Sequence, residues 1–264
     1  MFKTVRLEIV ENFAVEFHFT HLNLTIFVNG EFNSCEHDRI DLHENSCIFK
    51  VFPEVLMNNI AALRHDNAGS VTQFTLPEEI HTSRLFLRRL RYEDAPEIFY
   101  AYASKPEATR YVSWPTHRRI EDTYSFITYA RAAWENGNDF SYAIRLAGSN
   151  MLAGSIGVIH NDGAIQFGYI FSPAHWNNGY ATEACRALLA ELVKRPVTRI
   201  GTFVARENEA STRVLQKCGL IEEAFLPGWL LFPNAGPARK DCIQFRYPLA
   251  RIGGEIIPAG LPGE

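Results

Sequence analysis

The sequence lacks the features of a secreted, disulfide-stabilised or membrane-spanning protein. Its five cysteines, an odd number, include no Cys-x-x-Cys pair, which excludes the disulfide framework of small secreted domains. No run of apolar residues reaches the length of a transmembrane helix. The first residues, Met1–Glu8, alternate charged with apolar side chains instead of forming a signal-peptide core. We therefore expect a cytoplasmic protein that is not bound to a membrane.

Charge is sparse and unevenly divided along the chain. Only 21% of the 264 residues are charged, and the net charge is −4. Residues 1–80 contain 5 basic and 12 acidic residues, whereas residues 81–264 contain 21 basic and 18 acidic residues. An acidic first part argues against nucleic-acid binding, and the mild positive excess of the second part suits a small anionic ligand better than a duplex.

Residues 1–80 are expected to form a small β-rich domain of unknown role. Short apolar, β-branched and aromatic runs at 3–10, 13–19 and 23–28 predict an antiparallel sheet, followed by a strand at 47–52 and a helix at 53–64. A break at 66–70 and a proline at position 77 place the domain boundary near residue 80.

Four residues of this first part have the types that bind zinc: Cys35, His37, His43 and Cys47. Their spacing fits no zinc motif. A solvated polar hairpin is the favoured interpretation and a zinc site the alternative, so no metal is predicted for the chain.

From residue 81 the pattern predicts a mixed α/β domain that extends to residue 250. A strand at 84–90 leads into a helix with Ile98 and Tyr102 on its buried side. The further elements are a loop at 111–117, a helix at 120–134, strands at 139–146, 151–160 and 164–171, a helix at 180–194, a strand at 199–205, a helix at 208–218, and strands at 221–225 and 241–248. Residues 251–264, rich in Gly and Pro, are expected to be a disordered tail.

A strand, a turn of small residues and a helix start meet in residues 175–183, His-Trp-Asn-Asn-Gly-Tyr-Ala-Thr-Glu. The first N–H groups of a helix have no intrahelical partner, and the helix dipole favours negative charge there. Gly179 and Ala181 would let a phosphate approach the backbone closely. The interpretation without a ligand is an ordinary turn and helix cap, since Asn-Asn-Gly commonly forms one.

A second pattern begins at Asn208, which stands at a predicted helix N-cap with Ser211 one turn further on. Both side chains can point the same way. Plain capping is the interpretation without a ligand. Arg213 and Lys217, four residues apart, share one face of this helix, which is either a solvated basic face or a contact for phosphates.

The order of these elements, together with the two patterns, resembles the GNAT superfamily of acyl-CoA N-acetyltransferases, and its RimJ/RimL-type branch more closely. The matching segments are 82–88, 114–117, 167–170, 176–184 and 208–219, and the resemblance covers residues 82–248. It implies a mixed, mostly antiparallel central sheet flanked by helices. It also implies an N-acetyltransferase that moves an acetyl group from acetyl-CoA to a primary amine, by direct transfer in a ternary complex. The acceptor could be a protein N-terminus, an amino acid or a small amine.

The resemblance also implies roles for single residues. Asn208 would hold the pantetheine arm, Ser211 would donate a proton to the leaving thiolate, and Trp114 would contact the acceptor. The backbone of Ile170 or Phe171 would bind the thioester carbonyl. The predicted contacts of the coenzyme phosphates are Asn177, Asn178, Gly179, Tyr180, Ala181 and Thr182 in the loop, with Arg213 and Lys217 at the adenosine end.

Three positions depart from the pattern of relatives. Asn177 stands where relatives usually have Gly, although Asn tolerates a left-handed conformation better than most residues. Leu215 stands where other GNAT branches have a tyrosine acid, so the serine version is the one that this sequence can use. Gln166 occupies the stretch where many relatives hold a Glu base, and glutamine cannot accept the proton. The other candidate bases are His117, His160, Asp162 and Glu183.

The missing glutamate motivates an alternative function, a catalytically weak acyl-CoA-binding module whose N-terminal domain mediates protein contacts. Either reading predicts acetyl-CoA as ligand, and neither nucleic acid nor a membrane as partner. The sequence leaves the oligomeric state open, with a homodimer as one option.

Overall fold

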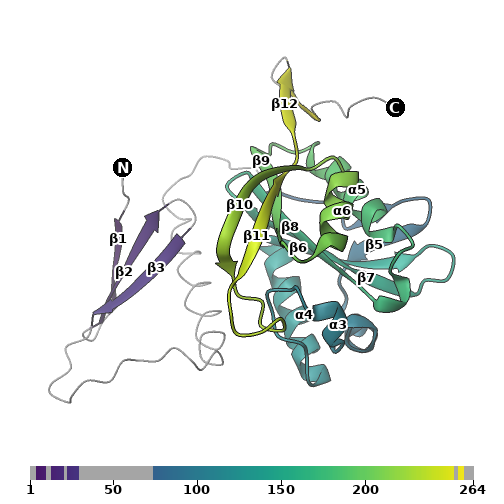
Figure 1. Cartoon of the computed structure of the whole chain (residues 1–264), viewed down its shortest axis with the longest axis horizontal. Coiled ribbons are helices and arrows are strands. Elements are labelled where there is room, and N and C mark those ends of the chain that lie inside the picture. Colours follow the sequence, from purple (N-terminus) through teal and green to yellow (C-terminus); the bar gives the residue numbers. More distant parts are fainter. Residues whose placement is uncertain (1–3, 10–12, 21–22, 30–73, 253–254, 259–264) are drawn as a thin grey trace. The chain divides into compact units, whose positions relative to one another are not determined.

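The computed structural model describes residues 4–9, 13–20, 23–29, 74–252 and 255–258, with side chains for 74–249. The chain divides into two compact units, Met1–Ser70 and Val71–Glu264 (Figure 1). This division lies before the boundary near residue 80 that the sequence predicts. Leu76 and Ile80 are buried in the core of the second unit, and strand β4 (Glu79–His81) pairs with its next strand, β5 (Leu85–Arg89).

In the first unit, the described residues form a three-stranded antiparallel sheet in the order β1-β2-β3. The strands are β1 (Thr4–Ile9), β2 (Phe13–Thr20) and β3 (Asn23–Asn29), as the sequence predicts. The predicted strand at 47–52, the predicted helix at 53–64 and the candidate zinc ligands Cys35, His37, His43 and Cys47 lie outside the described residues.

The second unit is built on an eight-stranded sheet in the order β10-β11-β9-β8-β7-β6-β5-β4. All neighbouring strands are antiparallel except β8 and β9, which confirms the mixed, mostly antiparallel sheet. The remaining strands are β6 (Asp139–Leu146), β7 (Leu152–Asn161), β8 (Ala164–Phe171), β9 (Arg199–Ala205), β10 (Ile221–Leu230) and β11 (Lys240–Arg246).

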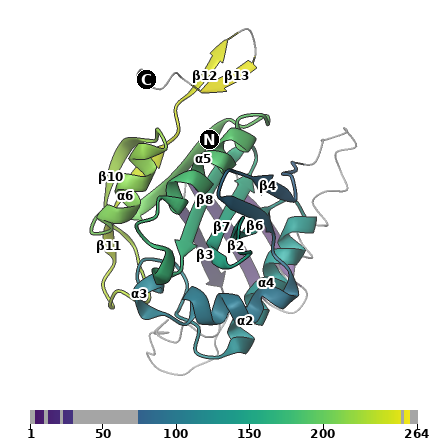
Figure 2. The same ribbon diagram turned by 90° about the vertical axis from the view of Figure 1, so that its right-hand side faces the viewer.

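Helices cover both faces of this sheet (Figure 2). On one face, Leu188 of α5 (Tyr180–Leu192) and Leu215 of α6 (Glu209–Lys217) share a buried core with Phe167 of β8. On the other face, Ile98 and Tyr102 form a second core with α4 (Ile120–Glu135). The helical run before α4 consists of η1 (Tyr92–Asp94), α2 (Ala95–Ile98), the π-helical η2 (Phe99–Ala103) and α3 (Pro106–Thr109). Alternating strand residues face opposite sides of a sheet, so the strands supply both cores.

The C-terminal residues correct one prediction. Where a disordered tail was expected from residue 251, strands β12 (Leu249–Ile252) and β13 (Glu255–Pro258) pair as an antiparallel hairpin. The β-branched residues Ile252, Ile256 and Ile257 favour extended backbone, and this local preference outweighs the Gly and Pro content of the segment.

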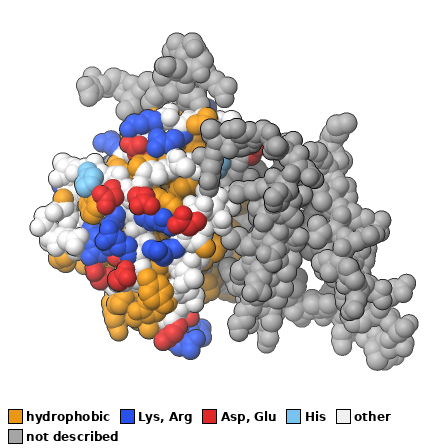
Figure 3. Space-filling model, turned by 180° about the vertical axis from the view of Figure 1, so that it is seen from behind, with side chains coloured by type: hydrophobic (Ala, Val, Ile, Leu, Met, Phe, Trp, Pro, Cys, Tyr) orange, Lys and Arg blue, Asp and Glu red, His pale blue; other side chains and the backbone are white. Residues whose placement is uncertain are grey.

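Within the described ranges, no helix combines the length and the apolar character needed to cross a membrane. The same ranges contain no cluster of three or more His, Cys, Asp or Glu side chains that could hold a metal ion. On the face that Figure 3 shows, basic side chains lie beside acidic ones instead of gathering into one large basic patch.

The partly buried carboxyl of Asp139, at the start of β6, gives a testable pH dependence. Burial raises the pKa of Asp139 to about 6, although the Ser141 hydroxyl, donating at 3.0 Å, opposes the shift. A folded pKa above the unfolded one gives stability at low pH that is lost as pH rises through about 6. Relative to Asp139→Asn, the wild type should lose at most about 3 kcal/mol of unfolding free energy between pH 4 and pH 7.

Urea unfolding of both proteins at several pH values measures this difference. Asp162→Asn, at an exposed turn position with φ = 48°, is the matched control, because asparagine tolerates that conformation equally well. Parallel pH profiles for the wild type and Asp139→Asn would contradict the assignment.

Candidate functional site

The turn that leads from β8 into α5, residues Ser172–Gly179 and here called the α5 turn, contains two left-handed residues. Asn177 has φ = 61° and Gly179 has φ = 76°. The turn therefore accommodates asparagine at position 177, as the sequence analysis expected. Trp176 Nε1 donates to the carbonyl of Phe171, the last residue of β8, at 3.0 Å. This bond ties the turn to the end of the strand.

Helix α5 begins with N–H groups that have no partner inside the helix. Gly179 is its N-cap and offers no capping side chain, and Glu183 N–H donates to Gly179 O at 3.1 Å. The N–H groups of Tyr180, Ala181 and Thr182 come before this bond, so helical geometry gives them no carbonyl partner. Together with the helix dipole, these groups form a site suited to an anion.

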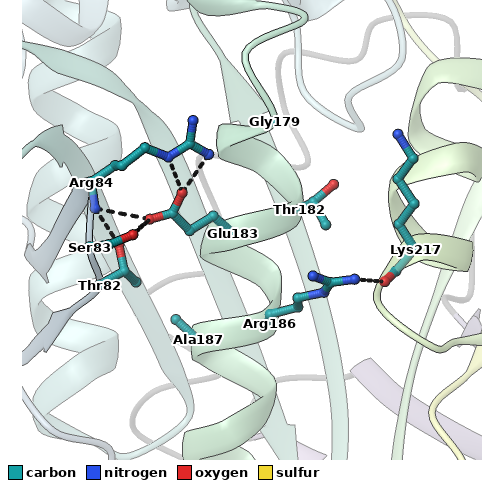
Figure 4. A pocket seen from close by; sticks show the side chains of 9 residues that line it. All are labelled: Thr82, Ser83, Arg84, Gly179, Thr182, Glu183, Arg186, Ala187 and Lys217. Carbon is teal, nitrogen blue, oxygen red and sulfur yellow. Dashed lines mark hydrogen bonds and ion pairs between the residues drawn. The ribbon is translucent and has the colours of Figure 1, made fainter. Parts of the chain in front are cut away.

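A surface cavity of about 720 Å³ lies beside this helix start (Figure 4). It is lined by Thr82, Ser83 and Arg84 before β5, by Gly179, Thr182, Glu183, Arg186 and Ala187 of α5 and its N-cap, and by Lys217 of α6. Arg186 Nη2 donates to the backbone carbonyl of Lys217 at 2.6 Å and so joins α5 to the end of α6. Arg186 and Lys217 beside a helix N-terminus favour an anionic ligand, whereas Glu183 compensates the charge of Arg84.

Glu183, in the first turn of α5, is held by residues that precede β5. Thr82 Oγ1 donates to Glu183 Oε1 at 2.6 Å, and Arg84 donates to the same oxygen from its backbone at 3.1 Å and to Oε2 from Nε at 2.6 Å. Burial by itself would raise the pKa of Glu183, but the hydrogen bonds from Thr82 and Arg84 outweigh it and lower the pKa. The carboxylate stays ionised, and both of its oxygens already accept hydrogen bonds from Thr82 or Arg84, so Glu183 is a poor candidate for a catalytic base.

Strands β8 and β9 pair over only part of their length. Their parallel register runs from Ala164↔Arg199 to Gln166↔Gly201, and within the described strands the pairing goes no further toward the α5 turn. On the opposite edge of β8, the N–H of Ser172, the residue after the strand, donates to the carbonyl of Ala153 in β7 at 2.9 Å. Backbone groups alternate between the two edges of a strand, so the N–H of Phe171 points toward the β9 side. Of the two predicted carbonyl-binding residues, the geometry favours Phe171 over Ile170.

The start of α6 lies next to β8. Asn208 Oδ1 accepts the backbone N–H of Ser211 at 3.2 Å, which is the capping contact that the sequence allows. Tyr169 of β8 donates its hydroxyl to the backbone carbonyl of Ser211 at 3.4 Å. Burial raises the pKa of Tyr169 well above its usual value. Tyr169 is therefore neutral and holds Ser211 near the part of β8 that β9 leaves unpaired.

Trp114, the predicted acceptor contact, is half-buried in the loop between α3 and α4. It packs against the same core as Ile170 of β8. Gln166 and Gly168 occupy the same face of β8 as Ile170, since they alternate with it, and both are exposed. An accessible strip of β8 and Trp114 thus lie on the sheet face opposite α5 and α6.

Asn234, in the loop between β10 and β11, joins that loop to the one that contains Trp114. Its Nδ2 donates to the carbonyls of Thr109 and Trp114, both at 2.8 Å. Its Oδ1 accepts the backbone N–H of Thr116 at 2.9 Å. One side chain therefore joins the two loops.

Two of the other candidate bases, His160 and Asp162, lie near the start of β8, far from the α5 turn that follows its other end. His160 is in register with Ile165, near the start of the strand, and Asp162 lies in the turn just before it. A strand rises about 3.3 Å per residue, so Phe171 at the end of β8 is about 20 Å from Ile165 and further still from this turn. Neither residue can reach a substrate at the α5 turn.

His117 has a different position, with its ring centroid 4.9 Å from that of Trp114. Its Nδ1 lies 2.7 Å from Thr123 Oγ1. Burial lowers the pKa of His117, although the nearby Asp122 opposes the shift. The imidazole is therefore neutral near pH 7 and able to accept a proton.

The structure brings some of the predicted ligand contacts together and separates others. Gly179, Thr182 and Lys217 line one cavity. Ala181 packs against the core, and Arg213 pairs with Glu209 at 3.1 Å without lining the cavity. Sequence reasoning missed two basic residues of the lining, Arg84 and Arg186. Arg186 follows Glu183 by one helical turn, a spacing that could have revealed it.

Comparisons with known proteins identify acetyltransferases. Residues 84–221, over half of the chain, match the family model described as an acetyltransferase (GNAT) domain. The chain is 30% identical over 162 residues to the uncharacterised N-acetyltransferase YoaA of Bacillus subtilis, and the match covers 60% of this chain and 90% of that protein.

Solved structures are similar as well. An acetyltransferase of the GNAT family from Bacillus anthracis has a TM-score of 0.57 and 25% identity, with 64% of this chain and 96% of that chain covered. RimL, a ribosomal L7/L12 α-N-protein acetyltransferase solved in complex with coenzyme A, has a TM-score of 0.58 and 16% identity, with 64% and 97% covered. The likeness to RimL is one of fold.

Proposed function

This chain belongs to the GNAT acetyltransferase family, and from that premise we propose that it transfers the acetyl group of acetyl-CoA to a primary amine. The observation that supports this proposal most strongly is the α5 turn. Its left-handed Asn177 and Gly179 lead into a helix start whose first N–H groups have no partner inside the helix, beside a cavity lined by Arg186 and Lys217.

The residues around the turn fit the charged part of acetyl-CoA. In the proposed complex, the pyrophosphate accepts hydrogen bonds from the N–H groups at the start of α5, where the helix dipole favours its charge. Arg186 and Lys217 lie further along the same cavity and would neutralise the phosphates of the adenosine end. The pantetheine arm would pass Asn208 and bring the thioester to the end of β8.

The proposed reaction is a direct attack in a ternary complex, without a covalent enzyme intermediate. The amine nitrogen bonds to the thioester carbonyl carbon, the nitrogen loses one proton, and the C–S bond breaks. The Phe171 N–H would stabilise the negative charge that develops on the carbonyl oxygen. Ser211 would give its hydroxyl proton to the leaving sulfur and recover it from solvent.

We assign the proton acceptor to His117, because its pKa is lowered and it contacts Trp114 on the acceptor side. His117→Gln is expected to lower kcat by about 10²-fold or more at pH 7, since glutamine keeps a hydrogen-bonding group for Thr123 but cannot take the proton. In the wild type, kcat/KM should fall as acid protonates the imidazole, and in His117→Gln this decline should disappear. A pH–rate profile measures both effects.

His81→Gln is the control, because His81 stacks on Phe86 and is exposed. If His117→Gln kept the wild-type rate and acid decline, the amine would lose its proton to water or to another group.

The acceptor itself is proposed only as a class: a protein N-terminus, an amino acid or a small amine. The loop at 109–117 and strand β8 contain no acidic residue, so a polycationic acceptor such as an aminoglycoside is disfavoured. RimL, whose fold is similar, is described as an acetyltransferase of protein N-termini, which supports peptides as the first acceptors to test.

Release of free thiol from acetyl-CoA tests the proposal. The full chain is incubated with acetyl-CoA and a panel of N-terminal peptides, amino acids and small amines, and products are identified by mass spectrometry. The proposal expects thiol release that depends on at least one amine. The second candidate, an acyl-CoA-binding module, is motivated by Gln166 in the place of a glutamate base. It predicts coenzyme binding without turnover over any amine.

A further inference from the structure

Arg84 has no part in the proposed reaction, yet it contacts both α5 and the turn before it. We propose that Arg84 is a positioning residue for the coenzyme, which orients the backbone of the α5 turn so that its N–H groups face the pyrophosphate. This inference rests on the proposed function, because it assigns a role within the same coenzyme site.

The guanidinium of Arg84 is fixed through all three of its nitrogens. Nε and Nη2 each lie 2.6 Å from Glu183 Oε2, and Nη1 donates to the backbone carbonyl of Asn178 at 3.0 Å. Its central carbon also lies 4.9 Å from the ring centre of Tyr180. A planar guanidinium presents its donors in a rigid fork, so binding Glu183 sets the direction of the bond to Asn178. Figure 4 shows Arg84 reaching from the segment before β5 to Glu183 of α5.

The bond to the Asn178 carbonyl determines where the next N–H points. In a trans peptide, the carbonyl of one residue and the N–H of the next point in opposite directions, and the described chain contains no cis peptide bond. Because Arg84 holds the Asn178 carbonyl, the Gly179 N–H points away from Arg84. Lys217 lies on that other side of α5 in Figure 4. The donor is thereby directed to the side where the phosphates would lie.

A second bond of the same kind fixes the preceding part of the turn. Asn178 Nδ2 donates to the carbonyl of Trp176 at 2.9 Å, so the Asn177 N–H is turned away from that contact. Two carbonyls of one short turn are thus bound by side chains, and two N–H groups are oriented as a consequence. A turn that is already oriented loses less conformational entropy when the ligand binds.

The contribution of Arg84 differs from that of a free positive charge. The Glu183 carboxylate lies directly against the guanidinium and compensates its charge. Lysine would keep the charge but has no planar fork, so one ammonium group cannot reproduce both the double contact with Glu183 and the bond to Asn178. A lysine variant therefore separates orientation from charge.

The test measures binding of two ligands to variants of the full chain. Coenzyme A is titrated calorimetrically, and pantetheine, which lacks the pyrophosphate, is followed by ligand-observed NMR. Arg84→Met should raise the Kd of coenzyme A about 10- to 100-fold, the range expected for a lost hydrogen bond to a charged group. The Kd of pantetheine should change less than about twofold, because its contacts do not depend on the turn. Arg84→Lys should bind coenzyme A almost as weakly as Arg84→Met does.

Arg199→Met is the matched control, since Arg199 forms a similar two-pronged pair with Glu223 and is similarly exposed, but contacts no part of the α5 turn. Wild-type coenzyme affinity in Arg84→Met, full recovery in Arg84→Lys, or equal weakening of both ligands would overturn the inference. If Arg84→Met does not fold, the Kd values of Arg84→Lys for coenzyme A and pantetheine test the inference instead. If the wild type binds no coenzyme A, the proposed function fails instead.

Discussion

Replacing Ser211 with alanine is expected to lower kcat by about 10²-fold or more, with little change in the KM for acetyl-CoA. The expected loss is that of a general acid that protonates the leaving thiolate, a contribution of about 10² to 10⁴ in rate. The helix cap should survive, because Asn208 Oδ1 accepts the backbone N–H of Ser211 and not its hydroxyl. Alanine is also a better helix former than serine. Steady-state kinetics with saturating acetyl-CoA measures the effect.

Thr212→Val serves as the control for Ser211→Ala. It removes a hydroxyl from the next residue of the same helix, and Thr212 Oγ1 is buried without a hydrogen-bond partner among the described residues. Its kcat should remain within about twofold of the wild type, since valine replaces threonine with little change in shape. Unchanged turnover in Ser211→Ala would show that the thiolate leaves without help from this hydroxyl.

Gly154→Ala is expected to have the largest effect on stability, about 3 kcal/mol or more of lost unfolding free energy, as for severe overpacking of a core. Gly154 lies in β7 opposite Phe171. A Cβ at this position would meet the Ile170 carbonyl oxygen at 2.3 Å and Phe171 Cα at 3.0 Å. Both atoms belong to backbone that cannot rotate away, so β8 would have to shift where the thioester is proposed to bind.

Urea unfolding measures this loss, and Gly168→Ala is its matched control. Gly168 lies in the neighbouring strand β8, where an added Cβ has nothing within 4 Å. Its unfolding free energy should change by less than about 0.5 kcal/mol. If Gly154→Ala were as stable as Gly168→Ala, the close approach of β7 to β8 would be wrong.

Much of the fold could be predicted because its main elements have strong local signals. The sequence predicts β8 and β9 at 164–171 and 199–205, which are their bounds in the structure. Asn208 and Gly219 mark the two ends of α6 through capping chemistry. The short elements β4 and α3 had no such signal, since three or four residues contain too little pattern to identify.

The site was harder to predict because its contacts join distant parts of the chain. The turn 177–179 is a local motif and was identified, whereas Arg84 bonds to Glu183 99 residues away. Strand alternation alone would place Arg88 on the face of β5 opposite the two core leucines of that strand. Arg88 is nevertheless buried. Its Nη1 and Nη2 donate hydrogen bonds to the Asp94 carboxylate at 2.8 and 2.6 Å, and this pairing compensates its charge. Periodicity shows which face a residue occupies but not which charged partner it meets there.

The three hydrogen bonds of Asn234 have a consequence for redesign. They join loops that lie 118 to 125 residues apart in sequence, so a graft that exchanges either loop alone leaves partly buried backbone groups without these partners. In a chimera, the segments around 109–116 and 231–239 should therefore be transferred together, because the side chain of Asn234 joins them by hydrogen bonds.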